Sequence, residues 1–593
     1  MNKRILSGVL LTITLSIISC TDSYEELPVD QFTQEYVFST TDSIGEQASY
    51  FLNAIYGALP NGYNRVDKDF LDAATDDAIS LCFDSEPGVA RLQMGRYTAS
   101  NLVADDMTWG TWYKAIRKCN YFINNIDVVP YRETYTNALG EVKPINYTKK
   151  AEARFLRAFF YFQLLERYGG IPLLGDKVYD LNDDMELPRN TFAESVDYIV
   201  SELDSIKNDL RETSTSDPNY VHAATTVACE ALKIRVLLYA ASPLFNGQTL
   251  EKGNPYVGYV DYDPNRWKLA ADAAREFIEK RGKTGTSTSP NVKFFQLKSS
   301  FTSTFLNHQG SSNYETIFFR NNGKESKSME TNNGPLGFTG SKLGNGRTNP
   351  TQNLVDAFPM KDGKKIGEST KYKYDPQKPY ENRDPRLDFT ILHNGSQWLN
   401  SILDTRIGGA NNPASTGRYS MTSYYTCKFM GDNKTTTEYG SHKDLWVYFR
   451  YAEILLNFAE AENEVNGPTD DVINALIHIR KRAGIEAGSD KKYGIDVNMT
   501  KDEMRELIHN ERRIEMAFEE QRYYDIRRWR EAEKIFAEPL KGMNIIKGSN
   551  TTVYSVVDVL KVNWTNKMYL YPIPYTEVNK NDQMVQNPYW EVR

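Results

Sequence analysis

The sequence predicts a mainly α-helical fold, a tetratricopeptide-like scaffold of paired helices that carries a large loop-rich face and a few short strands. Apolar residues recur at helical spacing in one stretch after another up to residue 280, and again from residue 447. Between them, residues 281–446 are rich in Gly, Asn, Ser, Thr and Pro and contain few long periodic runs. The strict 34-residue pattern of tetratricopeptide repeats is absent, so the pairing rests on amphipathic pattern alone.

The N-terminus is a targeting segment. Residues 1–19 are expected to be a signal peptide of the lipoprotein type, with a basic start and an apolar run at 5–18 that is shorter than the roughly 20 residues a membrane span needs. The run ends Ile-Ile-Ser before Cys20, which resembles a bacterial lipobox, where the thiol takes the lipid. The alternative is an ordinary signal peptide followed by a chance cysteine. We expect one domain over residues 20–593.

The longest helical pattern covers residues 148–174. Its apolar residues form an arc so wide that it implies contact with helices on more than one side. Thr148 is the expected N-cap, Gly169-Gly170 the expected C-cap, and Pro172 prevents any continuation.

Other helices are expected on both sides of the loop-rich region. Capping boxes mark the start of two of them, at Thr191 and Thr500, and the helix after Thr500 is long and highly charged. Short strands are expected at 315–320 and 424–430. The expected helices cover residues 43–59, 109–126, 191–210, 223–241, 267–278, 446–466, 472–483 and 500–529.

The charge of the chain excludes some partners. The formal net charge is −8, and losing Lys3 and Arg4 with the leader makes the mature chain more acidic. A broad nucleic-acid surface needs clustered basic residues, and so does electrostatic docking on anionic lipid, so neither is expected.

Metal, cofactor and nucleophile motifs are absent from the sequence. No two of the six histidines stand at i, i+4, and none of the five cysteines has CxxC spacing. There is no P-loop, dinucleotide fingerprint or G-x-S-x-G elbow. We therefore expect no metal and no cofactor, with Cys119 and Cys229 buried as small apolar residues. A bridge between Cys82 and Cys427 is neither supported nor excluded.

A glycan hydrolase remains an alternative because it needs only two carboxylates about 5–9 Å apart. The densest run of acids lies on the charged helix near the C-terminus, where arginines alternate with it. We interpret this run as ion pairs and a solvated face, since neighbouring guanidinium groups hold carboxylates ionised. The acids are Glu511, Glu515, Glu519 and Glu520, and the arginines are Arg512, Arg513 and Arg522.

Aromatic residues in the irregular stretches are the candidate ligand-binding residues. Sugar rings present C–H faces that stack on aromatic rings, and the chain holds 38 Tyr and 8 Trp. Phe83, Trp109 and Trp398 are predicted to bind ligand. Trp109 follows an acidic loop, and Trp398 lies in the polar segment Asn-Gly-Ser-Gln-Trp. Weaker candidates are Tyr259, Tyr262 and Phe338.

Separated motifs along the chain resemble the SusD/RagB family of surface lipoproteins, and in order and spacing they cover nearly the whole mature chain. The similar segments are the lipobox at Cys20, the helix 154–168 with Gly169-Gly170-Ile171-Pro172-Leu173, the helix 451–461, the segment 511–529 with its Tyr524-Asp525-Ile526-Arg527-Arg528-Trp529, and the closing Pro572-Ile573-Pro574 and Gln586-Asn587-Pro588.

The resemblance implies a protein of the bacterial outer membrane that is lipid-anchored, faces the exterior and captures a nutrient without breaking bonds. It implies an oligo- or polysaccharide ligand that is passed to a SusC-like TonB-dependent transporter. Capture of a peptide or another nutrient, and hydrolysis of a surface glycan, are the alternatives. The matching motifs belong to the scaffold and assign no ligand-binding residue.

Overall fold

The structure is a computed structural model. It describes residues 33–591 apart from 82–85, 104, 181, 215–220, 248–249, 284–292, 307–313, 325–327, 415–416, 432, 441–442 and 550. The signal peptide, Cys20, Phe83 and the question of a Cys82–Cys427 bridge lie outside the described residues.

About 41% of the chain is helical, which confirms the expectation of a mainly α-helical protein. The helices are α1 Gln34–Val37, α2 Glu46–Tyr56, α3 Gly88–Gln93, α4 Trp109–Asn125, α5 Ile145–Tyr168, α6 Phe192–Ile206, α7 Thr226–Ala241, α8 Asn265–Arg281, α9 Phe301–Leu306, α10 Ser328–Asn333, α11 Gln352–Ala357, α12 Arg386–Thr390, α13 Tyr451–Asn466, α14 Asp470–Ala483, α15 Lys501–Glu515, α16 Gln521–Arg528, α17 Ala532–Ile535 and α18 Tyr575–Val578.

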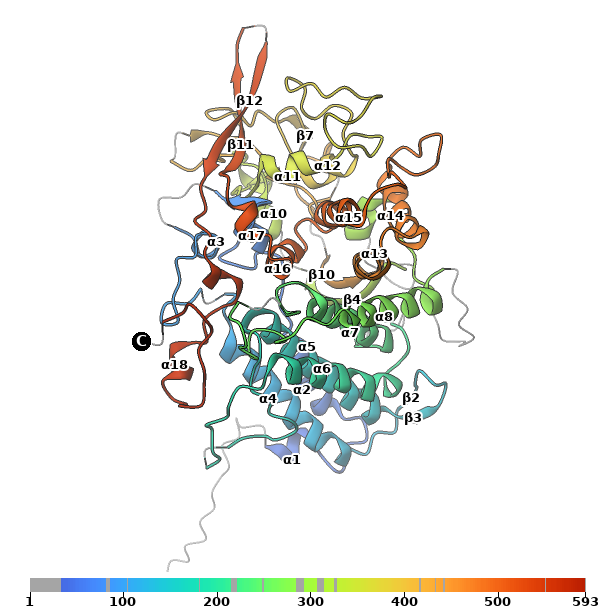
Figure 1. Ribbon diagram of the computed structural model, residues 1–593. Coiled ribbons are helices and arrows are strands. Elements are labelled where there is room, and N and C mark those ends of the chain that lie inside the picture. Colours follow the sequence, from blue (N-terminus) through green and yellow to red (C-terminus); the bar gives the residue numbers. More distant parts are fainter. Residues whose placement is uncertain are drawn as a thin grey trace, which may run out of the picture.

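The long helices pack on their neighbours in chain order (Figure 1). α4 contacts α5, α5 contacts α6, α6 contacts α7 and α7 contacts α8. α13 then packs on α8 across the intervening loop-rich segment, and α14 and α15 both pack on α13. The contact between α8 and α13 therefore joins the two helical parts into one stack, as expected for paired helices that complete each other's core.

Helix α5 is the centre of this stack. It contacts α2, α4, α6 and α7, which confirms the prediction of neighbours on more than one side. It begins at Ile145, after Pro144, so Thr148 is a buried residue inside the helix and not its N-cap. Gly169 ends it at φ 78°, as expected, and a Cβ there would lie 2.3 Å from the Tyr256 carbonyl oxygen.

Both predicted capping boxes are present. The Thr191 hydroxyl accepts a hydrogen bond from the Glu194 N–H while the Glu194 carboxylate accepts one from the Thr191 N–H, at the start of α6. Thr500 and Glu503 make the same reciprocal pair at the start of α15. Each box satisfies two backbone donors that the first turn leaves unpaired.

Two expectations about the C-terminal helices are wrong. Residues 446–450 belong to a strand, and α13 begins only at Tyr451. Alternating aromatic and aliphatic residues there fit a strand as well as a helix, and pairing with an antiparallel partner decides the outcome. The long charged helix is also interrupted, because Phe518 and Glu520 both adopt φ 62° between α15 and α16.

The strands form antiparallel pairs. Of the expected strand at 424–430 only two residues are paired, and the projecting hairpin β11–β12 at the top of Figure 1 was not predicted. The pairs are β1 Ala78–Ser80 with β5 Thr348–Pro350, β2 Thr134–Thr136 with β3 Val142–Pro144, β4 Thr316–Lys324 with β10 Lys443–Arg450, β6 Ile391–Leu392 with β9 Tyr425–Thr426, β7 Gln397–Trp398 with β8 Ser401–Ile402, and β11 Leu540–Lys547 with β12 Thr552–Leu560.

Among the described helices, none is both long enough and apolar enough to cross a membrane.

Candidate functional site

The two predicted tryptophans lie in the core. Trp398 is 1% exposed, and its indole Nε1 donates a hydrogen bond to the Tyr439 hydroxyl at 3.0 Å. Trp109 is 4% exposed and meets the Tyr168 ring edge-on, with the centroids 5.0 Å apart. A sugar stacks on a ring face that is open to solvent, and neither indole offers one. The ligand-binding role of both stays a prediction, and their burial argues against it.

The weaker candidates are dispersed. Tyr262 is exposed, while Tyr259 has the Arg266 guanidinium over its ring, 3.5 Å from the centroid, and a perpendicular contact with Phe192. Phe338 packs partly buried against the core. The structure therefore does not gather the predicted aromatic residues into one site.

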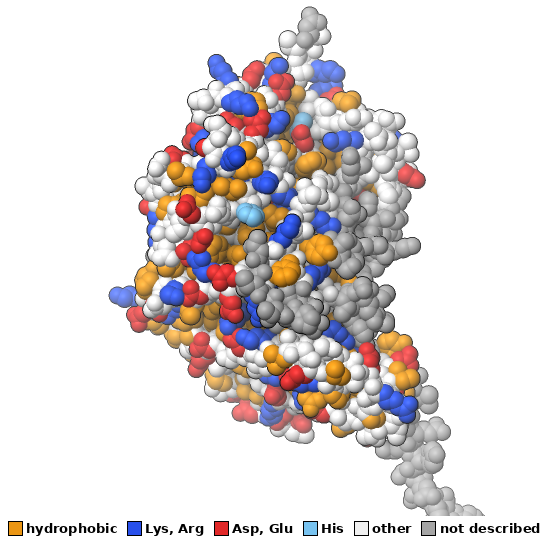
Figure 2. All heavy atoms as spheres, turned by 90° about the vertical axis from the view of Figure 1, so that its right-hand side faces the viewer, with side chains coloured by type: hydrophobic (Ala, Val, Ile, Leu, Met, Phe, Trp, Pro, Cys, Tyr) orange, Lys and Arg blue, Asp and Glu red, His pale blue; other side chains and the backbone are white. Residues whose placement is uncertain are grey.

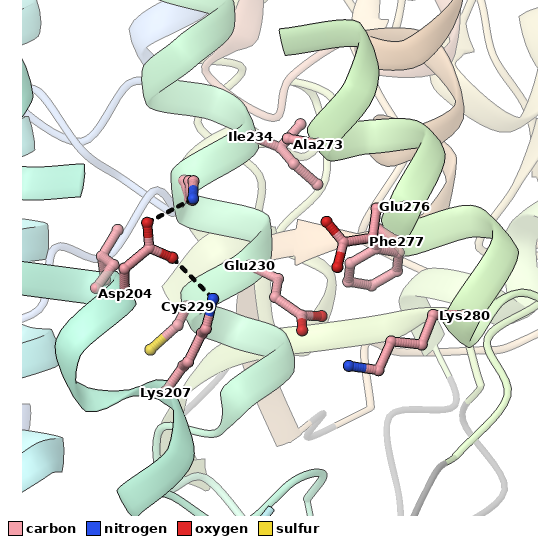
Figure 3. Close-up of a pocket in the computed structure, with 11 residues that line it drawn as sticks. Asp204, Lys207, Cys229, Glu230, Ile234, Ala273, Glu276, Phe277 and Lys280 are labelled. Atoms are coloured by element: carbon pink, nitrogen blue, oxygen red, sulfur yellow. Dashed lines mark hydrogen bonds and ion pairs between the residues drawn. The ribbon is translucent and has the colours of Figure 1, made fainter. Parts of the chain in front are cut away.

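A charged notch between α6, α7 and α8 is one of the hollows in the described surface (Figure 3). It encloses only about 50 Å³. The Asp204 carboxylate is bound by Lys207 at 3.0 Å and by Lys233 at 2.6 Å. Glu230 is bound by Arg281. Because these carboxylates are already neutralised and the space is small, the notch is a helix–helix salt-bridge cluster.

The acidic run near the C-terminus forms ion pairs, as predicted. The prediction that it is a solvated face is wrong, because the ion pairs are buried. Glu511 and Glu515 are 1% and 0% exposed, and their partners come mainly from other segments, including Arg386, Arg450 and Arg480. Burial alone would raise the pKa of Glu515, but three arginines outweigh it and lower that pKa well below its usual range. A carboxylate held ionised in this way cannot act as a general acid.

An open hollow of about 310 Å³ lies beside the outer half of the β11–β12 hairpin, where Tyr554 pairs with Ile545. We call it the hairpin hollow. Its lining combines two tyrosines and a histidine with long polar side chains from the loop-rich segment. The residues are Gln377, Lys378, Pro379, Tyr380, Glu381, Asp388, His393 and Tyr554.

The aromatic rings of the hairpin hollow form a corner. Tyr380 and His393 are stacked, with centroids 3.7 Å apart and an interplanar angle of 19°. Tyr554 stands at 88° to Tyr380, with centroids 6.0 Å apart. Two nearly perpendicular aromatic walls of this kind give a flat ligand one face to stack on and one edge to lean against.

Hydrogen bonds hold the corner in place. The Asn394 amide donates to the Tyr554 hydroxyl at 3.0 Å. The Gln377 amide pairs with the backbone of Tyr554, donating to its carbonyl oxygen and accepting from its N–H, both at 3.1 Å. The Tyr380 hydroxyl bonds to the buried Tyr424 hydroxyl at 3.2 Å. The rings are therefore positioned before a ligand arrives, which lowers the entropy cost of binding.

The charged side chains around the corner are exposed and pair with their neighbours. The Asp388 side chain is 62% exposed, with one oxygen 3.1 Å from His393 Nε2, while Lys378 and Glu381 pair with each other at 3.3 Å. Burial raises the pKa of Tyr380 well above its usual value, so its hydroxyl stays neutral. The site thus sets exposed carboxylate and ammonium groups beside a partly buried aromatic corner, a combination that suits a polyhydroxylated ring.

One segment of this candidate site was predicted from the sequence, and the tyrosines that line the hollow were not. The predicted residue there is Trp398, in the segment that begins at Asn394, and the structure turns Trp398 inward and Asn394 toward Tyr554. The tyrosine itself lies in an alternating run, Thr-Val-Tyr-Ser-Val-Val, whose period of two is a strand signal that could have been used. Among the described residues, no cluster of three or more His, Cys, Asp or Glu could hold a metal ion.

Two family models match long stretches of the chain. The model described as the SusD family matches residues 314–590, and a model described as starch-binding associating with outer membrane matches residues 69–238. SusD-like protein P2 of Formosa agariphila is 23% identical over 591 residues, which cover 97% of this chain and 98% of that protein.

Solved structures agree with these matches. A SusD-like protein from Bacteroides fragilis has a TM-score of 0.71 and 26% identity, covering 92% of this chain and 98% of that one. A laminarin-binding SusD-like protein has a TM-score of 0.60 and 17% identity, covering 92% and 99%. Surface glycan-binding protein A from Bacteroides uniformis has a TM-score of 0.60 and 18% identity, covering 91% and 99%.

The fold is that of the helical, SusD-like proteins. The chain belongs to the SusD/RagB family, as the motifs in its sequence indicated.

Proposed function

We propose that this protein is a cell-surface lipoprotein that binds an oligo- or polysaccharide and delivers it to a SusC-like TonB-dependent transporter of the outer membrane. The carrying observation is the perpendicular aromatic corner of Tyr380 and Tyr554, surrounded by exposed polar side chains, where the loop-rich segment meets β12. Loops on a rigid scaffold are where binding residues concentrate.

The family supports the class of ligand and the location. One matching family model is described as starch-binding and as associating with the outer membrane, and structural relatives are named for binding laminarin or surface glycans. We further propose that residues 1–19 are removed, that Cys20 carries the lipid, and that residues 20–593 form a single domain.

Binding without catalysis is part of the proposal. Because the hairpin hollow has exposed carboxylates, the absence of sugar hydrolysis has to be tested by experiment. Incubation of the pure protein with each bound oligosaccharide should leave the chain length of the sugar unchanged by chromatography. Appearance of shorter sugars would replace the capture function with a hydrolase.

The decisive experiment is a glycan array run in parallel with a peptide panel. The proposal expects glycan binding with micromolar or weaker affinity, because open sites of this kind make few fully buried contacts. The ligand should bind the wild type and bind the Tyr380→Ala and Tyr554→Ala variants more weakly. Binding of peptides alone would keep a capture role and change its ligand.

A further inference from the structure

A second, larger hollow lies on the helical part of the molecule. It measures about 940 Å³ and is enclosed by α8, α13, α14 and the segment 295–299, and it shares no lining residue with the hairpin hollow. We call it the helical groove. Figure 2 looks onto this side of the molecule, where hydrophobic side chains gather among lysines and arginines. Its volume is within the roughly 300–1,000 Å³ of ordinary ligand sites.

The floor of the helical groove combines aliphatic and aromatic side chains. Ile278 on α8, Leu455 on α13 and Ile477 on α14 line it together with Leu297. Of its aromatic rings, Phe458 is 4% exposed and has the Arg275 guanidinium over it at 4.9 Å. Phe295 and Tyr451 are also buried, at 2% and 7% exposed, so these three rings offer no open face for a sugar to stack on, and the floor favours a peptide over a glycan.

Two arginines on the lining are already bound to acids of the protein. Arg275 pairs with Glu462 at 3.0 Å and with Asp471 at 2.8 Å. Arg482 is held by Glu315 at 3.0 Å. These arginines stabilise the walls and are not available to a ligand.

The rim nevertheless carries uncompensated positive charge. Lys283, Lys481 and Lys491 are exposed, and among the described residues none of them has an acidic side chain within ion-pair distance. Of the two acids in the described lining, Asp471 is paired with Arg275, and Glu279 has no arginine or lysine within ion-pair distance. One unpaired carboxylate therefore stands against three unpaired lysines in the described part of the rim. The rim is therefore basic although the chain as a whole carries a net charge of −8.

We infer that the helical groove binds an acidic, aliphatic-rich peptide segment of a partner protein. Leu, Ile or Val side chains of the segment would fill the floor, and its Asp or Glu side chains would pair with the three rim lysines. This is the arrangement of groove recognition in which apolar anchors give affinity and rim charges give orientation and salt dependence. The inference does not depend on what occupies the hairpin hollow.

Fluorescence polarisation with synthetic peptides tests this. Labelled 15-residue peptides rich in Glu and Leu are compared with charge-reversed peptides rich in Lys and Leu and with peptides rich in Glu and Ser. The Glu/Leu peptides should bind, more weakly as salt is raised, and the other two sets should not. The Lys481→Glu/Lys491→Glu variant should bind the Glu/Leu peptides roughly tenfold more weakly.

A matched control reverses two exposed lysines elsewhere. Lys114→Glu/Lys118→Glu on α4 changes the net charge by the same amount and should bind like the wild type. Ile477→Asp tests the floor and should lose binding while its thermal midpoint stays near that of Ile477→Ser. Failure of every Glu/Leu peptide to bind, or equal binding by the two lysine variants, would overturn the inference. Displacement of the bound peptide by a sulfated oligosaccharide would reassign the groove to anionic glycans.

Discussion

The hydroxyl of Tyr554 on β12 accepts a hydrogen bond from the side-chain amide of Asn394, which precedes the β7–β8 turn, at 3.0 Å. These residues are 160 positions apart in the sequence, and the bond fastens the projecting hairpin to the loop-rich segment. Together with the Gln377 amide on the Tyr554 backbone, it makes the hairpin a wall of the hollow and not only an extension from the surface.

Removing one ring of the corner should weaken glycan binding with little effect on folding. Tyr554→Ala keeps the backbone bonds to Gln377 and loses one stacking face, so we expect a roughly fivefold to tenfold increase in Kd, which corresponds to about 1 kcal/mol. Isothermal titration calorimetry measures the Kd of each variant. Tyr147→Ala removes an exposed tyrosine from α5 and should leave Kd unchanged. Equal Kd values for the two variants would discard the hairpin hollow as the binding site.

Trp398 should matter for stability and not for binding. Trp398→Ala empties a fully buried site and should lower the free energy of unfolding by about 3–5 kcal/mol. Trp398→Phe keeps a ring but loses the donor to Tyr439, and should cost roughly 1 kcal/mol for the lost bond, plus a packing penalty. Denaturant unfolding gives both values. A folded Trp398→Phe protein with abolished glycan binding would instead restore the predicted ligand-binding role.

Arg450 should be one of the most sensitive positions in the scaffold. Its guanidinium lies 3.0 Å from Glu315, 2.7 Å from Glu515 and 2.7 Å from Glu519, all buried. Arg450→Met leaves three carboxylates short of a cation, and we expect a loss of about 3–5 kcal/mol in unfolding free energy. Arg450→Lys retains the charge and should lose less. A methionine variant as stable as the lysine variant would mean that the network contributes little net stability.

Asp72 should make stability depend on pH. Burial, with the nearby Asp77 charge, raises its pKa from 3.8 to about 8, while the Phe518 N–H donates to one oxygen at 2.8 Å. The folded state therefore keeps a proton that the unfolded chain releases. The contribution of this proton to the free energy of unfolding is complete below about pH 4. It falls by up to about 1.4 kcal/mol per pH unit as pH rises from 4 to 8, and it is lost once pH has passed the folded-state pKa.

Asp72→Asn isolates this effect, because asparagine retains the acceptor oxygen and does not titrate. The difference in unfolding free energy between the variant and the wild type should grow in favour of the variant from pH 5 to pH 8. Asp558→Asn, at an exposed position on β12, serves as the comparison and should show no such trend. A constant difference for Asp72→Asn across that range would contradict the assignment of a raised pKa.

Cys20→Ala should release the protein from membranes. The proposed lipid is the anchor, and each buried CH₂ of an acyl chain contributes about 0.8 kcal/mol to membrane affinity. Fractionation of cells that express the variant should move the protein from the membrane pellet to the soluble fraction. Retention in the pellet after a salt wash would show that something other than this lipid holds the protein there.

The sequence by itself determined the helical scaffold. Apolar residues at helical spacing, capping boxes at Thr191 and Thr500, and the glycine that ends α5 are local signals, and local hydrogen bonding and steric limits act on them wherever the chain goes. The motifs that indicated the family, such as the helix 154–168 with Gly169-Gly170 and the segment 511–529, belong to the same scaffold.

Only the tertiary structure decided which aromatic residues face the solvent. Trp398 and Tyr554 both lie in short polar-flanked runs, yet one packs against Tyr439 and the other forms a wall of the hollow. Likewise Phe518 and Glu520 leave helical geometry where Asp72 binds the Phe518 N–H and Arg65 lies beside Glu520. These outcomes depend on partners that are distant in the sequence, 41 residues away for Trp398 and 446 residues away for Phe518, and periodicity along the chain carries no information about such contacts.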